Sequence, residues 1–274
     1  MILIVSSNKD TASQNIKKQM LKGYKFEKSS ENFQENAIYE AQVNEKEVKL
    51  ITIDEESVYA QNLPNFFSSL QSIVFISRHS SESGTPTLSV HTPGNLGEAQ
   101  LGGLPRKVSV APANAMRETL KAMAQIKQEN KLEYEVSYEC THHGPSLDVP
   151  TMFAELGSSP TQWNDAKAAE AVAHATIEAI SKSDEESGKA VLGVGGPHYN
   201  AKFTRIALEN DLAFGHIIPK YAVPSIDKEI LRQCVEKTKE KVDHAVLDWK
   251  GIKGENKQML VRILNEISLP FEKV

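Results

Sequence analysis

Short apolar runs alternate with amphipathic segments along the whole chain. Two of these runs, residues 73–76 and 190–194, are almost entirely apolar, as in strands buried on both faces of a parallel sheet. In the intervening segments apolar residues recur every three or four positions, which predicts helices that pack against such a sheet. Strands are expected at residues 2–5, 37–43, 47–53, 72–77, 88–91, 134–140, 152–156, 190–194, 213–219 and 245–247.

The helices expected from the same pattern fall between these strands. They cover residues 11–21, 112–130, 159–182, 201–210, 225–242 and 254–267, with a short helix from Pro64. Residues 29–36 and 181–189 are expected to be polar or charged loops. Alternation of strands and helices predicts an α/β protein: a three-layer α/β/α sandwich with a mostly parallel mixed sheet. Since no repeat and no linker divides the sequence, residues 1–274 are expected to form a single domain.

Composition and charge narrow the class of protein. The chain is 40% hydrophobic and 24% charged, as expected for a globular protein with a large core. No apolar stretch has the length needed to cross a bilayer, and Cys140 and Cys234 form no pattern. We therefore expect a cytoplasmic protein with two reduced, buried thiols.

The formal net charge of −5 means that any nucleic acid must meet a local basic patch. Two groups of cations are candidates, although both can equally be solvated helix faces, since Glu229, Glu236 and Glu240 interrupt the second. The groups are Lys17, Lys18, Lys22, Lys25 and Lys28, and Lys228, Arg232, Lys237, Lys239 and Lys241.

The segment Thr141-His142-His143-Gly144-Pro145 is the most distinctive in the sequence. It abruptly ends the extended run 134–140. Adjacent side chains on a regular strand point to opposite faces, so both histidines can share one site only where the strand has already turned. Gly144 and Pro145 favour such a turn. We expect one histidine to take part in the chemistry and the other to orient or contact the substrate.

Three predicted strands end in histidine, at His79, at His142-His143 and at His198. Ligands of open α/β sheets bind at the carboxyl ends of the strands, so these histidines are expected to converge on one crevice. Imidazole suits both proton transfer near neutral pH and zinc binding. Taken singly, each histidine can also be structural or contact only the substrate.

Three further residues are candidates beside the histidines. Glu155 lies within the apolar run 152–156, where it is either a solvated group or a buried acid of raised pKa that acts as a base or metal ligand. Gly195 and Gly196 follow a strand, and their N–H groups either receive a phosphate, ribose or oxyanion or simply form a tight turn. Since the chain has no Gly-x-Ser-x-Gly sequence, hydrolysis by activated water is favoured over a serine nucleophile.

Five motifs, taken together and in order, resemble the archaeal and plant type of D-aminoacyl-tRNA deacylase. The first contains Arg78 and His79, the second His91 and Asn95, and the third is the double-histidine turn. The motifs occupy residues 77–84, 91–95, 141–145, 153–158 with Trp163, and 195–199. The resemblance extends over nearly the whole chain.

The resemblance implies hydrolysis of the ester that joins a D-amino acid to the 3′ end of tRNA, which releases free tRNA and the D-amino acid. It also implies zinc dependence and a fold related to peptidyl-tRNA hydrolases and nucleoside phosphorylases. An acidic protein of this family needs to grip only the acceptor end of tRNA. A membrane, DNA or an obligatory protein partner is not expected.

On this basis we expect water, activated by zinc or histidine, to attack the ester carbonyl. His142 and His198 are the preferred metal ligands or activators, with His143 and Glu155 in proton transfer. The residues expected to bind the substrate are Arg78, His79, His91, Asn95, Thr141, Gly195 and Gly196. Two alternatives use the same crevice: a nucleoside phosphorylase or hydrolase, and a non-catalytic module that binds the tRNA end.

Overall fold

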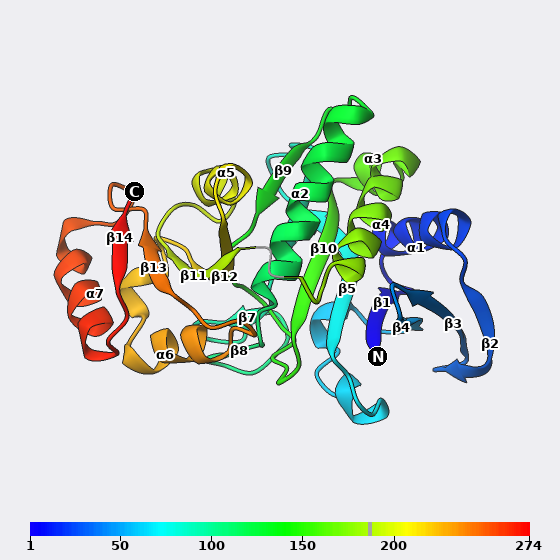
Figure 1. The fold of residues 1–274 in the computed structure, drawn as a ribbon, viewed down its shortest axis with the longest axis horizontal. Coiled ribbons are helices and arrows are strands. Elements are labelled where there is room, and N and C mark those ends of the chain that lie inside the picture. The colour runs from blue at the N-terminus through cyan, green and yellow to red at the C-terminus, as the bar shows by residue number, and fades with distance from the viewer. Residues whose placement is uncertain (186–187) are drawn as a thin grey trace.

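The computed structural model describes residues 1–185 and 188–274 and confirms the α/β class (Figure 1). Residues 186 and 187, within the predicted charged loop 181–189, lie outside the described residues. Within the described part, no helix is both long enough and apolar enough to span a bilayer.

The larger of two main sheets has eight strands, and its centre is parallel. Its strands β4, β1, β5 and β10 run parallel, whereas β6 is antiparallel to β10 and β2–β3–β4 form antiparallel hairpins. At the far edge, β9 pairs parallel with β6. In sheet order the strands are β2 (Glu27–Phe33), β3 (Asn36–Val43), β4 (Lys46–Ile53), β1 (Ile2–Ser7), β5 (Ser72–Ser80), β10 (Thr151–Ser158), β6 (Thr87–His91) and β9 (Glu135–Tyr138).

The smaller sheet is entirely parallel. Its order is β12 (Leu212–Ile218), β11 (Lys189–Val194), β13 (His244–Leu247) and β14 (Phe271–Lys273), and a separate short pair joins β7 (Gly94–Asn95) to β8 (Lys107–Val108). The mostly parallel mixed pattern is confirmed, but the strands divide between two sheets. Immediately after β9, the N–H of Cys140 donates to the carbonyl of His198 and that of Thr141 to Ile217. The chain therefore joins the two sheets at this segment.

Helices cover both faces of the smaller sheet and one face of the larger. Helices α1 (Thr11–Gly23), α2 (Ala113–Glu129) and α4 (Ala166–Ser181) pack on the larger sheet, whose other face is covered by the 3-10 turns η1 (Ser57–Tyr59) and η2 (Leu63–Phe66). Helix α5 (Ala201–Glu209) shares a core with α2 against the smaller sheet. Helices α6 (Lys228–Glu236) and α7 (Gly254–Glu266) cover the opposite face. The three-layer arrangement is complete around the smaller sheet.

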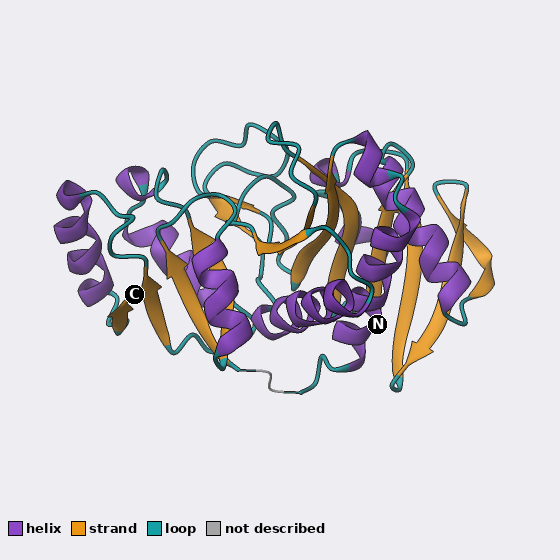
Figure 2. Ribbon diagram, turned by 90° about the horizontal axis from the view of Figure 1, so that it is seen from above, coloured by secondary structure: helices purple, strands orange, loops and turns teal. Residues whose placement is uncertain are grey.

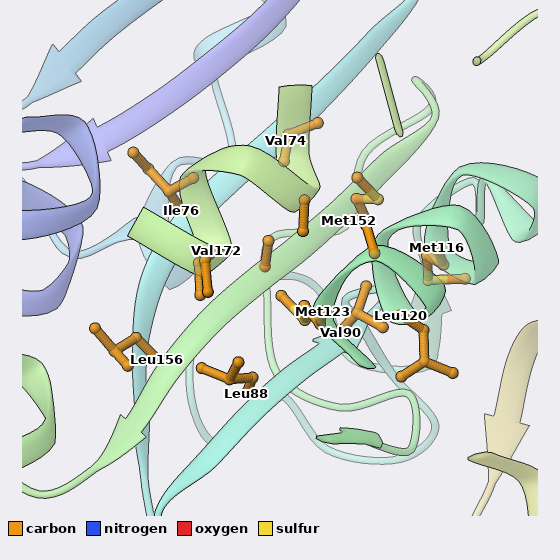
Figure 3. Packing of buried hydrophobic residues seen from close by; sticks show 14 of the residues in the cluster. Val74, Ile76, Leu88, Val90, Met116, Leu120, Met123, Met152, Leu156 and Val172 are labelled. Carbon is orange, nitrogen blue, oxygen red and sulfur yellow. The ribbon is translucent and has the colours of Figure 1, made fainter. Parts of the chain in front are cut away.

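The period-two pattern of the strands explains their nearly all-apolar sequences. On β5, Val74 and Ile76 face the helices, while Ile73 and Phe75 face the 3-10 turns. Figure 3 shows Ile76 near Val172 of α4, and Met123 of α2 beside Val90 of β6. Both faces of β5 are buried, as expected for a strand at the centre of a parallel sheet.

Three elements differ from the sequence predictions for local reasons. Residues 27–33, partly predicted as a loop, form the edge strand β2, whose mostly exposed polar side chains leave no apolar alternation. The helix predicted from 159 to 182 breaks into α3 (Pro160–Trp163) and α4, because the Asp165 side chain caps α4. The helix predicted from Ser225 starts at Lys228 after the short turn η3 (Val223–Ser225), and Asp227 caps it.

The position of this last cap can be tested by mutation. The Asp227 carboxylate accepts a hydrogen bond from the N–H of Ile230 at 3.1 Å. Asp227→Ala is expected to lower the free energy of unfolding by about 1 kcal/mol, since a free N–H at the helix start is left without its partner. Ser225→Ala, at the predicted cap, is expected to have almost no effect in the same urea denaturation. A larger effect at Ser225 would contradict the observed helix start.

Candidate active site

A cavity of about 550 Å³ lies where the two sheets meet. The carboxyl-terminal halves of β5 and β10 form one wall, and residues that follow β9 and β11 form another. Figure 2 shows long loops gathered on one side of the molecule, between the two sheets. The polar residues that line the cavity include Arg78, His79, Glu139, His142, His143, Glu155, His198 and Tyr199. The three histidine-ended strands therefore converge, although one of them belongs to the second sheet.

The double-histidine turn directs both of its imidazoles into this region. His143 has a φ of 41°, in the left-handed region, and the Gly144–Pro145 peptide is cis. The strand has thus ended before the two histidines, and their ring centroids lie only 4.2 Å apart. A regular strand would have separated the two side chains on opposite faces.

His91 completes a cluster of three histidines. It lies at the end of β6, with 1% of its surface exposed, and its Nε2 is 3.3 Å from Nε2 of His143. The Nδ1–H groups of His142 and His143 donate to the carbonyls of Cys140, at 2.8 Å, and Gly144, at 2.7 Å. Each of these two rings therefore keeps an Nε2 lone pair directed away from the backbone.

Burial makes these three imidazoles neutral. It lowers the pKa of His143 to about 4, and it lowers those of His91 and His142 well below the usual value. A second proton on a neighbouring histidine, His198 included, would repel one on His91 or His142, which adds to the lowering of their pKa. Neutral imidazole is the form that binds a metal or accepts a proton.

Glu139 is the carboxylate that the other histidines share. Its Oε2 lies 3.0 Å from Nε2 of His198 and 3.7 Å from Nε2 of His142, while its Oε1 lies 3.1 Å from Nδ1 of His79. Burial alone would raise the pKa of Glu139, but its hydrogen bond to His198 and its close contact with His79 lower it well below the usual value. A buried carboxylate anion thus lies at the centre of the site.

His198 is held between this carboxylate and a thiol. Its Nδ1 lies 3.2 Å from the Cys140 sulfur and 3.2 Å from the hydroxyl of Tyr221. Burial would lower the pKa of His198, but the contacts with Cys140 and Glu139 outweigh it and raise the pKa to about 10. His198 thus differs from the three neutral imidazoles: each of its ring nitrogens has a hydrogen-bond acceptor beside it, so the ring can carry two protons.

Glu155 is a buried acid with partners, which answers the question left open by its sequence. Its carboxylate accepts a hydrogen bond from the Ser77 hydroxyl at 2.7 Å and lies 3.7 Å from Nδ1 of His79. Burial raises the pKa of Glu155 to about 7, although the contact with His79 opposes the rise. His79 has its pKa raised to about 10, because the two glutamates outweigh its burial.

A second cavity, of about 430 Å³, adjoins the first and shares its histidines. His142, His143 and His198 line both cavities. Asn95, Thr141 and Tyr221 line only the second cavity. Tyr221 is 60% exposed to solvent. A substrate that occupies both cavities would have its middle at the three histidines.

Two of the residues predicted to bind the substrate line the second cavity, but their side chains already form hydrogen bonds within the protein. Asn95 donates to the carbonyls of Gly102 and Leu104, and Thr141 bonds to His216 and the N–H of Ile217. These contacts shape the second cavity. Arg78 lines the first cavity, and its Nη2 donates to both carboxylate oxygens of Glu56, at 2.9 and 3.1 Å.

Three other predicted substrate residues do not line either cavity. His91 lies behind the double histidine and contacts His143. The N–H of Gly195 donates to the carbonyl of Ile218 at 2.8 Å, so it has no capacity left for an oxyanion. Gly196 packs against Asn200 with a φ of 75°. The oxyanion role expected for these glycines is therefore wrong for Gly195, and both form the tight turn that was the alternative.

Sequence reasoning missed Glu139 and Tyr221 and treated Cys140 only as a buried thiol. Cys140 is indeed buried and free, as is Cys234, but its sulfur contacts His198. Glu139 lies three residues before His142, within the extended run that precedes the histidines. An acidic residue at that point of a buried strand was the available signal, as it was for Glu155.

Three sets of side chains in the described part of the chain could hold a metal ion. In each set the ligand atoms lie within 4.8 Å of one another: His91 with His142 and His143, Cys140 with His142 and His198, and His79 with Glu139 and Glu155. His142 belongs to two of the sets. The carbonyl contacts of His142 and His143 are of the kind that orient histidine ligands of zinc.

The register of β10 against His79 depends on a glycine. A Cβ added to Gly157 would lie 2.2 Å from the His79 carbonyl oxygen, which also accepts a hydrogen bond from the Trp163 indole. Gly157→Ala is expected to destabilise the protein by about 1–3 kcal/mol, because the two strands must separate. Gly23→Ala, where a Cβ has open space, is the control in urea denaturation. Equal stability of the two variants would contradict this packing.

Comparison with known proteins gives one consistent result. The model of the D-aminoacyl-tRNA deacylase family matches residues 66–272. The D-aminoacyl-tRNA deacylases of Pyrococcus furiosus and Thermococcus kodakarensis are 37% and 38% identical to this chain, over 100% and 99% of both chains. The crystal structure of a conserved protein of unknown function is 30% identical, with a TM-score of 0.89 over 100% of this chain and 95% of that one. This chain therefore belongs to the D-aminoacyl-tRNA deacylase family.

Proposed function

We propose that this chain hydrolyses the ester of D-aminoacyl-tRNA at the three histidines shared by the two cavities. The observation that carries the proposal is the Glu139 carboxylate, which contacts histidines from three separate segments beside a cluster of neutral imidazoles. Such a pairing of a cationic and several neutral imidazoles can both remove and supply protons. The ester would lie at the wall common to both cavities, with the aminoacyl group on one side and the terminal adenosine on the other.

Zinc is the cofactor that we propose, and His91, His142 and His143 are the residues that fit it best. The 3.3 Å between Nε2 of His91 and Nε2 of His143 is about the separation of two nitrogen ligands on a tetrahedral zinc ion. In this proposal His142 remains a ligand, as expected from the sequence. His143, expected from the sequence to act in proton transfer, becomes a ligand, and His198 becomes a proton donor, because its Nε2 faces the Glu139 carboxylate. Bound zinc would lower the pKa of a coordinated water toward about 7.

The protein's own residues supply the proton transfers. Glu139 holds the His198 imidazolium at the cavity wall, where Nε2–H or Nδ1–H can be given to the departing 3′ oxygen of the ribose. The same cation stabilises negative charge as it develops on the ester. Glu155 and His79 lie behind Glu139 and contact it through His79, so this chain of groups can take up the proton that the attacking water loses and return one to His198.

Zinc dependence can be tested directly. Treatment with a chelator is expected to reduce hydrolysis of D-Tyr-tRNA by about 10²-fold or more, and added zinc is expected to restore it. One zinc ion per chain should be found by atomic absorption, and His91→Ala should lose it. His174, an exposed histidine of α4, provides the control variant His174→Ala, which should retain zinc. Full activity in a protein shown to contain no metal would contradict zinc dependence.

Two other activities would use the same site and can be separated by their products. A nucleoside phosphorylase or hydrolase would release free base from a nucleoside, with or without phosphate. A binding module would retain D-Tyr-tRNA without loss of its ester. We expect release of free D-tyrosine and intact tRNA, with no release of base from adenosine. A stable complex of the protein with D-Tyr-tRNA, in which the ester stays intact, would overturn the proposal in favour of the binding module.

A further inference from the structure

The carboxyl edge of the smaller sheet extends from the active site to a separate surface. Its four strands are parallel, so the segments that follow them lie along one edge. His198 and Tyr221 follow β11 and β12 at the cavities, whereas Trp249 follows β13 and Lys273 lies at the end of β14. The segments contact one another along the edge: the N–H of Lys220 donates to Gly196, and that of Asp248 to Val194.

An aromatic ring with two cations stands at the outer end of this edge. The amino groups of Lys257 and Lys273 lie 4.9 and 3.9 Å from the centre of a Trp249 ring. A surface hollow of about 660 Å³ lies beside Trp249, and Lys257, Gln258 and Arg262 of α7 also line it. Figure 1 shows β14 and α7 at the end of the molecule that carries the C-terminus.

The cations of this edge are mostly not neutralised. Lys220, Lys250, Lys253, Lys257 and Lys273 have no carboxylate within 4.0 Å among residues 1–185 and 188–274. Two of the nearby acids form other ion pairs: Glu266 with Lys228 and Arg262, and Glu272 with His244. By contrast, the later basic group expected from the sequence is largely paired, as Lys228 with Glu266, Arg232 with Glu236 and Lys237 with Asp148. Compared with that later group, the sheet edge carries more unpaired positive charge.

We propose that this edge surface, defined as Trp249 with Lys250, Lys257 and Lys273, binds the phosphate backbone of the acceptor arm of the substrate tRNA. The proposal rests on the proposed function and adds to it the surface that holds the RNA. Two strand spacings separate β11 from β14, about 10 Å, so nucleotides next to the esterified adenosine can reach the surface. Lysines bind phosphates without regard to sequence, and an aromatic ring among them can stack on an unpaired base.

The active site binds only the terminal nucleotide. The rest of the tRNA must therefore be bound by electrostatic contacts with its phosphates. A protein of net charge −5 repels the polyanion over most of its surface. A local group of unpaired lysines beside the active site would orient the approach of the 3′ end. Release of counterions from the RNA drives such contacts. Each contact to a phosphate that is removed should therefore reduce the magnitude of the slope of log affinity against log salt concentration by about 0.7–0.9.

The test compares two triple variants of equal charge. Lys250→Ala with Lys257→Ala and Lys273→Ala removes the edge cations. The matched control is Lys18→Ala with Lys22→Ala and Lys28→Ala, exposed lysines of α1 and β2 that have no ion pair among the described residues. The edge variant is expected to raise KM for D-Tyr-tRNA by roughly tenfold or more at low salt, with kcat unchanged and a smaller salt slope. The control should change KM by less than about twofold.

A substrate without phosphates separates an RNA contact from damage to the active site. Both variants should hydrolyse the 3′-O-D-tyrosyl ester of adenosine at the wild-type rate. Two results would contradict the proposal that the edge surface binds tRNA. One is an equal KM of the two variants for D-Tyr-tRNA, and the other is an edge variant that loses as much activity on the adenosine ester as on D-Tyr-tRNA. If wild-type protein cleaved neither substrate, the proposed function would fail, and filter binding of uncharged tRNA by the two variants would still decide the edge surface.

Discussion

Replacement of His142 by alanine is expected to lower kcat for D-Tyr-tRNA hydrolysis by about 10²–10⁴-fold. His142 lines both cavities, belongs to two of the three possible ligand sets and lies 3.7 Å from the Glu139 carboxylate. The variant therefore loses a neutral imidazole at the point where the ester would lie. The fold should remain, since the side chain lines a cavity and does not fill the core. Single-turnover rates measure the effect without interference from product release.

His174→Ala is the matched control for this prediction. His174 is half-exposed on α4 and contacts Tyr24 and Glu178, away from both cavities. It should retain the wild-type rate. If His142→Ala also retained that rate, the shared wall would not be the reaction centre.

Glu139→Gln is the second change with a large expected effect. The substitution keeps the shape of the side chain but removes the negative charge that His79, His142 and His198 share. We expect kcat to fall by about 10²-fold or more, because His198 no longer keeps its proton for the leaving group. The pKa of His198, raised to about 10 in the native protein, should fall toward the usual value. An NMR titration of the His198 ring measures this fall.

Glu178→Gln controls for the loss of one carboxylate. Glu178 forms an ion pair with Lys182 on α4 at 2.7 Å, outside the cavities. It should leave both kcat and the His198 titration unchanged. A Glu139→Gln variant with full activity would remove Glu139 from the mechanism, even if His142→Ala were inactive.

The strands were predictable because their apolar patterns are local. Residues 72–77 form most of β5 and residues 190–194 most of β11, each buried on both faces. Division into two sheets was not predictable in the same way. The junction between them, for example, depends on hydrogen bonds from Cys140 and Thr141 to residues 58 and 76 positions later in the chain. Such long-range pairing leaves no periodic signal in either segment.

The site was predictable where strand ends carry histidine. His79, His142, His143 and His198 converge as expected, and Glu155 is buried, which was one of the two alternatives for its position. Gly195 was misjudged because the sequence does not reveal that its N–H is bonded to Ile218. Glu139 could have been suspected as an acid in a buried strand, but which histidines it contacts depends on where β9 leaves its sheet.

The most direct test of the account compares the initial rates at which wild-type protein hydrolyses D-Tyr-tRNA and L-Tyr-tRNA, with His142→Ala measured beside it. We predict that the D-ester is lost at least about tenfold faster than the L-ester, and that His142→Ala abolishes this difference. Equal loss of both esters at the spontaneous rate, or a preference for the D-ester that survives in His142→Ala, would contradict the account.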